Sequence, residues 1–512
     1  MFKYIKEFFE NKSNSKEDSE VCVMFSKSLE TNIQMFKTEF DNSADLTIKR
    51  LKKEKLNAVL ITLEGMVNKQ VLSTAVTNPV LNADYDGLTA EDMYNYISDS
   101  LISSSEQVEV TSFNESYKLL ACGFALVMID NINRAVAVGV QGFSIRSVSD
   151  PAVEISQNGS REGFVEAIKI NMSLIRRRIH SPKLKFENMK VGVETPTNIS
   201  ICYIRGKATA KMVREVKKRL RSINLPNVLA ASYIMPYLAE KNEVSLFSGC
   251  YISERPDTVC AKMSEGRICI LVDGTPSVIC VPYLFVEHFQ SMDDYISRPY
   301  YATFIRWLKY LSFFAAALLP GLYVATGTFN PELFPEALLN KIAISIASTP
   351  FPLVLEALII HIIYEIVREA GLRLPKTLGH AVSIVGGLVI GDSAVKSGLI
   401  GDTTLMILAL TAIASYIIPN LYEPIAILRL IFIVVGGIAG IWGIMLVFNI
   451  LLLNMCSQKS FGIPFMSPIT PFSLFGMRDV AIRAGWKTLA KKNNVVSGMP
   501  GADSYNIDSQ ND

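Results

Sequence analysis

Residues 425–454, IAILRLIFIVVGGIAGIWGIMLVFNILLLN, decide the class of the fold. Arg429 is the only charged residue among them. A helix crosses the hydrocarbon core of a bilayer with about 20 apolar residues. At about 1.5 Å per residue, this segment exceeds that length and must tilt or begin in the interface. The sequence therefore predicts a membrane domain.

The apolar sequence extends upstream, so that residues 307–454 form one nearly continuous apolar region. Residues 1–300 are mixed and rich in charge. The chain of 512 residues is 50% hydrophobic and 19% charged, with a mean hydropathy of +0.29. These values become consistent when a soluble domain is joined to a membrane domain. The net charge of +2 and the lack of a basic block argue against a nucleic-acid partner.

The number of apolar segments conflicts with the charge of the C-terminal tail. The candidates are residues 307–326, where Pro320 should kink the helix, 342–367, 383–402, 403–422 and 425–454. Five crossings would leave the tail outside, whereas basic residues at 478–492 favour the cytoplasmic side. One segment must therefore be split, re-entrant or interfacial, and residues 342–367 and 383–402 are the two suspects. We expect an all-α domain of about four to six membrane segments.

Residues 383–402, SIVGGLVIGDSAVKSGLIGD, separate into two faces on a helix. One face carries the pore or gate candidates Val385, Val389, Asp392 and Lys396. The opposite face carries small residues that let helices pack closely in lipid, Gly387, Gly391, Ala394 and Gly398. Charges at this depth are costly and usually functional. Asp392 and Lys396 either line or gate an aqueous path, neutralise one another in a packed bundle, or lie near the surface.

A second polar site is predicted where prolines interrupt residues 342–367. Pro350 and Pro352 flank a single phenylalanine and cannot continue a helix. Irregular backbone at membrane depth is tolerated where it is buried in protein or lines an aqueous cavity. Glu356 follows about one turn later, either as a functional carboxylate beside the break or as a satisfied contact within the bundle.

The charge-rich part alternates strand-like and helix-like segments, which predicts two α/β subdomains. Strands are indicated at 57–63 and 107–110, and hairpins around 130–134 and 273–276. Helices are indicated at 89–102, with Thr89 as N-cap, at 161–179 and at 210–223.

We divide the chain accordingly. The expected parts are a disordered tail (1–20), α/β subdomains at 21–150 and 151–290, a juxtamembrane linker (291–306), the membrane domain (307–454) and a C-terminal tail (455–512). The first twenty residues contain no apolar run of the kind that forms a signal peptide. We therefore expect the first domain, like the basic tail, in the cytosol.

The sequence carries no recognisable catalytic motif. It contains no GxGxxG, Walker loop, HExxH or GxSxG. Its eight cysteines form no CxxC pair and its four histidines have no ligand spacing, which favours reduced thiols over a metal site. We expect a protein that is not an enzyme and that uses no cofactor.

Several stretches resemble one known family. They are DPAVEISQNGSREGFVEAIKINMSLIRRRI (150–179), ERPDTVCAKMSEGRICILVDGTPSVICVP (254–282), DDYISRP (293–299), PNLYEPIAILRL (419–430) and FGMRDVAIRAGW (475–486). Together with residues 383–402, they resemble the A subunits of the GerA-type spore germinant receptors of endospore-forming Bacilli and Clostridia. The resemblance runs from about residue 40 to 486. It departs at residues 157–161, where the family usually has an Arg-Gly-Pro-Arg turn.

The resemblance implies a place and a task. It implies the spore inner membrane, with the α/β subdomains in the spore core, self-association, a transporter-like B subunit that binds the germinant, and a C-subunit lipoprotein. It also implies that monovalent cations pass when the complex is triggered. Our leading interpretation is a non-enzymatic receptor and ion-channel subunit that signals in spore germination. A secondary transporter with its site near residues 350–352 and a non-conducting membrane scaffold are the alternatives.

Overall fold

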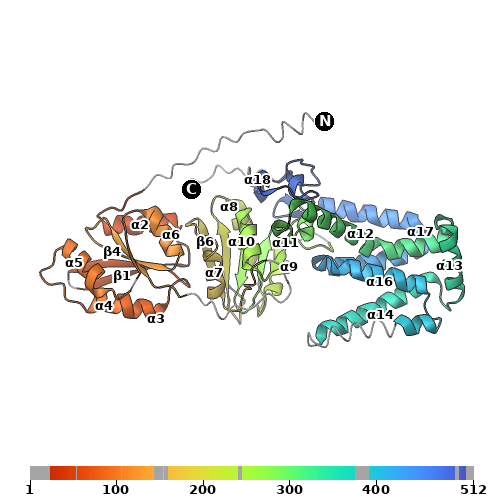
Figure 1. The fold of residues 1–512 in the computed structure, drawn as a ribbon, viewed down its shortest axis with the longest axis horizontal. Coiled ribbons are helices and arrows are strands. Elements are labelled where there is room, and N and C mark those ends of the chain that lie inside the picture. Colours follow the sequence, from red (N-terminus) through yellow and green to blue (C-terminus); the bar gives the residue numbers. More distant parts are fainter. Residues whose placement is uncertain are drawn as a thin grey trace.

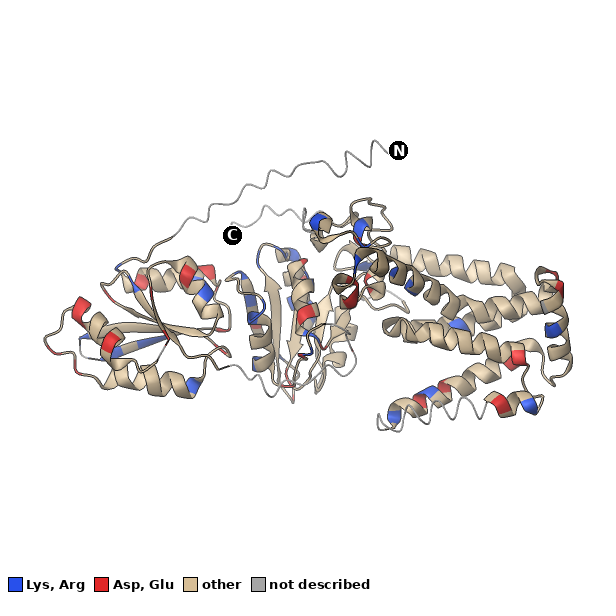
Figure 2. Ribbon diagram, viewed as in Figure 1, with Lys and Arg blue, Asp and Glu red and all other residues tan. Residues whose placement is uncertain are grey.

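The structure, a computed structural model, describes residues 23–53, 55–104, 106–142, 154, 159–239, 245–374, 391–489 and 495–502. Two sheets with flanking helices come first, and a bundle of long helices follows (Figure 1). Charged residues are frequent on the two sheet units and sparse on the long helices (Figure 2). The predicted order, a sheet-rich α/β region and then a helical region, is confirmed.

The first α/β unit is a five-stranded sheet in the order β1-β2-β4-β5-β3, in which all neighbours are antiparallel. Alternate residues of the central strands face opposite sides, so Val59 and Ile61 pack under α2 and α6 while Ala58 and Leu60 pack under α4 and α5. Its elements are α2 (Leu29–Glu39), β1 (Leu46–Lys53), β2 (Leu56–Leu63), α3 (Lys69–Leu72), α4 (Asn78–Asn82), α5 (Ala90–Tyr96), β3 (Gln107–Val110), α6 (Phe113–Ala121), β4 (Phe124–Ile129) and β5 (Ala135–Gly139).

The second α/β unit has the same design, with the strand order β6-β7-β9-β10-β8 and only antiparallel neighbours. Helices α7 and α10 cover one face and α8 covers the other. Its elements are α7 (Ile168–Arg176), β6 (Leu184–Val191), β7 (Thr197–Ile204), α8 (Ala210–Arg221), α9 (Met235–Leu238), β8 (Tyr251–Ser253), α10 (Pro256–Ser264), β9 (Ile268–Val272) and β10 (Val278–Val281).

The two units repeat each other in detail. Asp130, after β4, accepts a hydrogen bond from the backbone N–H of Leu29 at the start of α2 (3.1 Å). Asp273, after β9, accepts one from the N–H of Ile168 at the start of α7 (3.2 Å). Each aspartate is also bonded to an asparagine on the neighbouring strand. The helices α6 and α10 occupy matching places, and each is followed by a glycine with a φ of 87°. The units are therefore two copies of one fold.

A buried ion pair joins the two units. Arg176 of α7 and Asp45, before β1, lie 2.6 Å apart, and both side chains are almost fully buried. The guanidinium also donates to the carbonyl of Leu184 at the start of β6. A charge-assisted contact without solvent access holds the relative position of the units strictly.

Most predicted elements of this region are confirmed. Strands form at 57–63 and 107–110, both hairpins form, and Thr89 caps α5 through a reciprocal bond with Asp92. The helix expected at 161–179 is shorter, because α7 spans only Ile168–Arg176. The N–H of Phe164 bonds the carbonyl of Glu254 instead, so the chain before α7 follows the second sheet.

The helical region begins earlier than the sequence indicates. Residues expected to be a linker form α11 (Met292–Ile296) and the first turns of α12, which continues through Pro320. Two helical stretches, Pro299–Phe329 and Pro419–Ser457, are long and apolar enough to cross a membrane. The main helices are α12 (Pro299–Phe329), α13 (Glu336–Ala347), α14 (Leu353–Arg373), α16 (Asp402–Tyr416) and α17 (Tyr422–Ser457).

Helix α17 reverses direction at Gly440. This glycine has φ 62° and ψ −152°, outside the helical range. A Cβ on Gly443 would lie 2.7 Å from a methyl of Val435, although residues eight apart in a straight helix are about 12 Å apart. Before α17, Asn420 lines a cavity against the second unit, and shortly after α17 the hydroxyl of Ser460 donates to the backbone carbonyl of Gly249, next to β8, at 3.1 Å. Both ends of α17 therefore lie beside the second α/β unit.

Of the two segments suspected of an interruption, residues 342–367 are split as expected, between α13 and α14. A further segment, residues 425–454, folds back at Gly440. Its first half packs closely on α12, where the Cα of Gly321 and Gly436 leave no space for a side chain. Residues 375–390 lie outside the described residues.

The reversal predicts that Gly440→Ala destabilises the helical region. A φ of 62° costs an L side chain roughly 1–2 kcal/mol, and the added Cβ would lie 3.1 Å from the ring of Phe329. We expect the apparent Tm of the purified chain in detergent to fall by several degrees. Gly485→Ala is the control, because nothing lies within 4 Å of its Cβ position. Equal Tm values for both variants would contradict the reversal.

Candidate functional site

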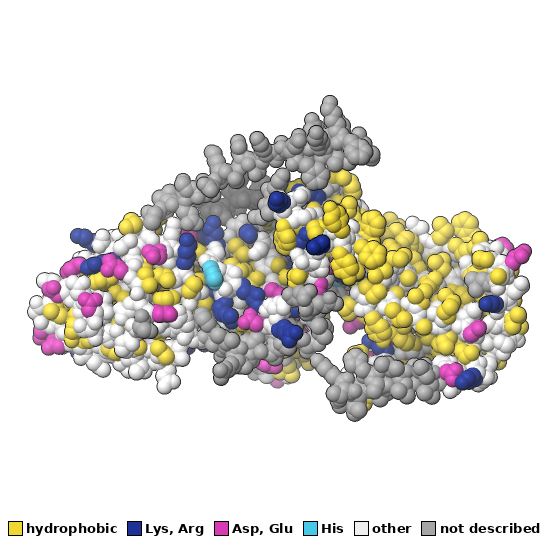
Figure 3. Space-filling model, viewed as in Figure 1, with side chains coloured by type: hydrophobic (Ala, Val, Ile, Leu, Met, Phe, Trp, Pro, Cys, Tyr) yellow, Lys and Arg dark blue, Asp and Glu magenta, His cyan; other side chains and the backbone are white. Residues whose placement is uncertain are grey.

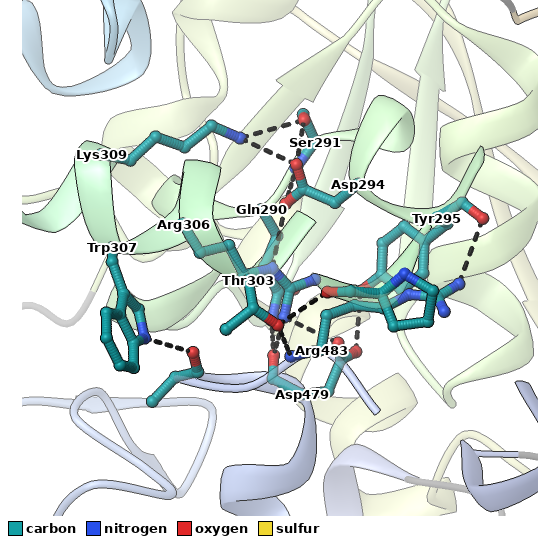
Figure 4. A network of polar contacts seen from close by, with 12 residues as sticks. Gln290, Ser291, Asp294, Tyr295, Thr303, Arg306, Trp307, Lys309, Asp479 and Arg483 are labelled. Carbon is teal, nitrogen blue, oxygen red and sulfur yellow. Dashed lines mark hydrogen bonds and ion pairs between the residues drawn. The ribbon is translucent and has the colours of Figure 1, made fainter. Parts of the chain in front are cut away.

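Arg306, two turns into α12, is the centre of a polar network between the second α/β unit and the helical region (Figure 4). Its side chain is 0% exposed. Its Nε donates to Oδ2 of Asp294 at 3.0 Å, and its Nη1 donates to Oδ1 of Asp479 at 2.8 Å. Asp294 belongs to α11 and Asp479 to the C-terminal tail. One side chain therefore connects three separate segments of the chain.

Further bonds hold the tail at this place. The hydroxyl of Tyr295 donates to Oδ2 of Asp479 at 2.7 Å, and the indole of Trp307 donates to the carbonyl of Ala481 at 2.8 Å (Figure 4). Burial, together with the charge of Asp479, raises the pKa of Tyr295 well above its ordinary value, so the hydroxyl stays a donor. The tail is thus fixed to α11 and α12 together.

Asp294 is shared between two cations of α12. Besides Arg306, Lys309 donates to its Oδ1 at 3.1 Å, and Lys309 also donates to the hydroxyl of Ser291 at 3.0 Å (Figure 4). Ser291 and Asp294 in turn form the reciprocal cap of α11. The carboxylate of Asp294 therefore both caps α11 and pairs with the two cations of α12.

A second buried charge cluster lies in the neighbouring part of the second unit. Glu287 pairs with Arg267 at 2.6 Å and with Lys262 of α10, and it accepts a bond from the N–H of Leu284. Burial disfavours its charge, but the two cations hold the pKa of Glu287 below its ordinary value. The carboxylate is therefore charged, and it ties α10 to the chain that leads into α11.

A cavity of about 530 Å³ is lined by residues of both clusters. Tyr251, Tyr283 and Trp486 contribute aromatic walls, and Pro419 and Asn420 reach it from the turn before α17. Burial raises the pKa of Glu154, which lines it and accepts a bond from the hydroxyl of Ser253 at 2.6 Å.

Five stretches that carry the family resemblance meet at this cavity. Glu154, Arg255, Asp293, Asn420 and Asp479 all line it, and each comes from a different one of those stretches. In the sequence, these stretches indicated only the family, and the candidate site was predicted in the membrane domain instead. One sequence feature could have pointed to this cavity: each stretch carries polar or charged residues that neither helical nor strand periodicity explains.

The predicted pair Asp392 and Lys396 lies on a short helical segment, residues 391–396. Nζ of Lys396 donates to Oδ2 of Asp392 at 2.7 Å. The side chain of Lys396 is 75% exposed and that of Asp392 is 56% exposed. Val385, Val389 and Gly387 lie outside the described residues.

The small residues of the same segment lie on the other side. Ala394 is buried against Ile360 of α14 and Leu408 of α16. A Cβ on Gly391 would touch Leu405 at 3.4 Å, and Gly398 ends the segment with a φ of 68°. Since Ile360 and Leu408 lie about two turns inside their helices, the segment is packed within the bundle rather than beyond its end.

Glu356 lies where two interruptions of the chain meet. Pro350 and Pro352 separate α13 from α14, and Glu356 follows in the first turn of α14, 1% exposed. Its Oε1 accepts from the N–H of Gly401 at 2.8 Å, and its Oε2 from the hydroxyl of Thr349 at 3.4 Å. The carboxylate therefore caps the N-terminus of α16 from a different helix.

Arg429 is buried rather than directed to the interface as a snorkelling side chain. It is 1% exposed, and it donates to the carbonyl of Ala316 at 3.1 Å and to the hydroxyl of Ser415 at 2.5 Å. It therefore links α12, α16 and α17. Within the described part of the chain, no group of three or more His, Cys, Asp and Glu side chains could hold a metal ion.

The network predicts a large effect for Arg306→Ala. It would leave Asp294 and Asp479 buried without this partner, and breaking a buried pair costs about 3–5 kcal/mol. We expect a lower apparent Tm and faster protease cleavage in the tail. Arg306→Lys keeps the charge but cannot donate in two directions at once, so its apparent Tm should lie between those of the parent chain and Arg306→Ala. Arg50→Ala, which breaks an exposed pair, is the control at under about 1 kcal/mol. A tail as resistant as in the parent chain would refute the network.

Comparison with known proteins identifies the family. Residues 34–495 match the Bacillus/Clostridium GerA spore germination protein family. The chain is 37% identical over 487 residues to spore germination protein KA of Bacillus subtilis (strain 168), covering 94% of this chain and 89% of that protein. It is 34% identical over 375 residues to spore germination protein GerLA of Bacillus cereus, covering 73% and 76%.

One solved structure is also similar. The crystal structure of the N-terminal domain of the A subunit of the Bacillus megaterium spore germinant receptor GerK3 covers 52% of this chain and 98% of that domain, with 30% identity and a TM-score of 0.41. The family match over residues 34–495 and the two relatives from Bacillus subtilis and Bacillus cereus show that the chain belongs to the GerA family, as an A subunit of the spore germinant receptor type.

Proposed function

We propose that the chain self-associates in the spore inner membrane and forms a ligand-gated path for monovalent cations. One observation carries this proposal. The pair Asp392–Lys396 is exposed on a segment whose other side is packed within the bundle. An ion pair facing lipid at that depth is costly, so this face must meet water or another subunit. A path between copies of the chain satisfies both conditions.

The proposed arrangement carries the chain across the membrane on α12, α14, α16 and the two halves of α17. The chain leaves α17 on the side on which it entered, which agrees with the contact between the tail and α11. The two α/β units and the tail would then lie in the spore core.

The proposed signal comes from partners and passes through the junction at Arg306. A transporter-like B subunit would bind the germinant, and a C-subunit lipoprotein would complete the receptor. A partner that binds one state of the complex more tightly shifts the population toward it. Because α11, α12 and the tail share the Arg306 network, a displacement of the α/β units moves α12 with them.

Neutralising the two charges separately tests the path. In Asp392→Asn, the remaining Lys396 repels cations, and an unpaired charge about 5 Å from an ion costs about 2–3 kcal/mol at an effective dielectric constant near 20–30. We expect triggered K⁺ release from spores to fall by roughly tenfold or more. Lys396→Gln, which leaves Asp392, should keep the flux or raise it.

A matched control is Glu369→Gln with Arg373→Gln. This pair has the same spacing of four residues and comparable exposure, at the other end of α14. It should leave K⁺ release unchanged. If Asp392→Asn and Lys396→Gln behave alike and like this control, the chain is a scaffold and not the path.

A secondary transporter is the second candidate, because two chain interruptions meet at the buried carboxylate of Glu356. Interrupted helices whose ends face a polar group are typical of substrate and ion sites in transporters. In this case Glu356→Gln should abolish stoichiometric uptake of solute in proteoliposomes while the protein remains folded. Ion flux without solute movement in the parent chain would exclude the transporter.

A further inference from the structure

A stripe of exposed apolar side chains begins at the first turn of α12. Tyr300, Phe304, Trp307, Leu311 and Phe314 recur at intervals of three and four residues, and all are exposed. This spacing places them on one face of the helix. Figure 3 shows apolar side chains gathered over the long helices and around the start of that region. The stripe is therefore an exposed apolar face of α12, of the kind that a membrane helix presents to lipid.

The position of Trp307 along this helix sets a level. From Trp307 to the end of α12 at Phe329, the helix rises about 33 Å, which matches the roughly 30 Å of a bilayer's hydrocarbon core. Tryptophan and tyrosine side chains accumulate at the boundary of that core. Trp307, with Tyr300 about two turns before it, therefore marks the level of the lipid headgroups.

The C-terminal tail is attached to α12 at this same level. Trp307 donates to the carbonyl of Ala481, and the hydroxyl of Thr303 accepts from the N–H of Arg483. Ile482, between these two anchored residues, is 58% exposed, and Trp486 is 61% exposed. Phe472 and Leu474 of the same segment are exposed as well. The tail thus adds large apolar side chains beside the start of the stripe.

We propose that residues 472–486 rest in the headgroup region of an anionic phospholipid leaflet, as a membrane-surface anchor. The apolar surface of the tail continues the lipid-facing stripe of α12, which favours lipid over a protein partner. Its rim is basic, with Arg298 and Lys487 exposed beside it. Cations near a leaflet of anionic lipids are attracted to its negative surface potential. A lipid surface offers both the apolar and the anionic component that this segment matches.

The anchor would make the contacts of Arg306 with α11 and the tail depend on the lipid composition of the membrane. The segment that contacts lipid through Ile482 and Trp486 also supplies Asp479 to Arg306. A change in the depth of the tail therefore acts on the same contacts that fix α11 and α12. This inference concerns the tail surface and holds whether or not the chain conducts ions.

Spin labels can measure the depth of the tail. The full-length chain, with Cys22 and the exposed Cys122 and Cys456 replaced by serine, would carry a nitroxide at Ile482→Cys and be placed in nanodiscs of phosphatidylcholine and phosphatidylglycerol. Leu311→Cys, on the α12 stripe, is the lipid reference. Leu229→Cys, exposed on the second α/β unit, is the aqueous reference. Collision rates with oxygen and with a water-soluble nickel chelate give the depth.

We expect the oxygen-to-nickel ratio at position 482 to lie between the references and at least about fivefold above that of position 229. Replacing phosphatidylglycerol by phosphatidylcholine, or introducing Lys487→Gln, should lower the ratio. A value equal to that of position 229 would overturn the proposal. Low access to both reagents, appearing only when other subunits are present, would assign the surface to a protein partner and overturn it equally.

Discussion

The buried guanidinium of Arg306 is the contact on which the arrangement of the molecule depends. It neutralises Asp294 and Asp479 at once, and each of these carboxylates would be costly to bury without it. Because the planar group donates in two directions, it fixes angles as well as distances between α11, α12 and the tail. The second α/β unit and the helical bundle are therefore joined by buried ionic contacts as well as by the chain itself.

Local sequence patterns predicted the α/β region well where local forces decide it. Alternation in residues 57–63, turn residues around 130–134 and the Thr89 cap all specify their elements without distant help. The start of α7 was wrong because the residue that caps it, Asp273, lies on another hairpin. Periodicity continued through residues 161–167, whereas the tertiary bond of Phe164 with Glu254 prevailed.

Local sequence patterns could not predict the reversal in α17 or the contact between Arg306 and the tail, for two different reasons. Residues 425–454 are apolar throughout, so hydropathy records their length but not where they turn; only the glycines around Gly440 indicated a bend. The junction joins Arg306 to a carboxylate 173 positions later, and no spacing rule covers that separation. By contrast, the proline break before Glu356 was visible because two prolines exclude a helix whatever their surroundings.

The duplication of the α/β unit has a consequence for the distal copy. In the second unit, α10 and the turn at Gly266 carry Lys262 and Arg267 to the charge cluster beside the helical region. The first unit has the same helix, α6, and the same turn at Gly123. There, counted from the glycine, Leu119 and Phe124 stand at the places of Lys262 and Arg267. The first unit therefore repeats the fold of this connecting surface without its charges.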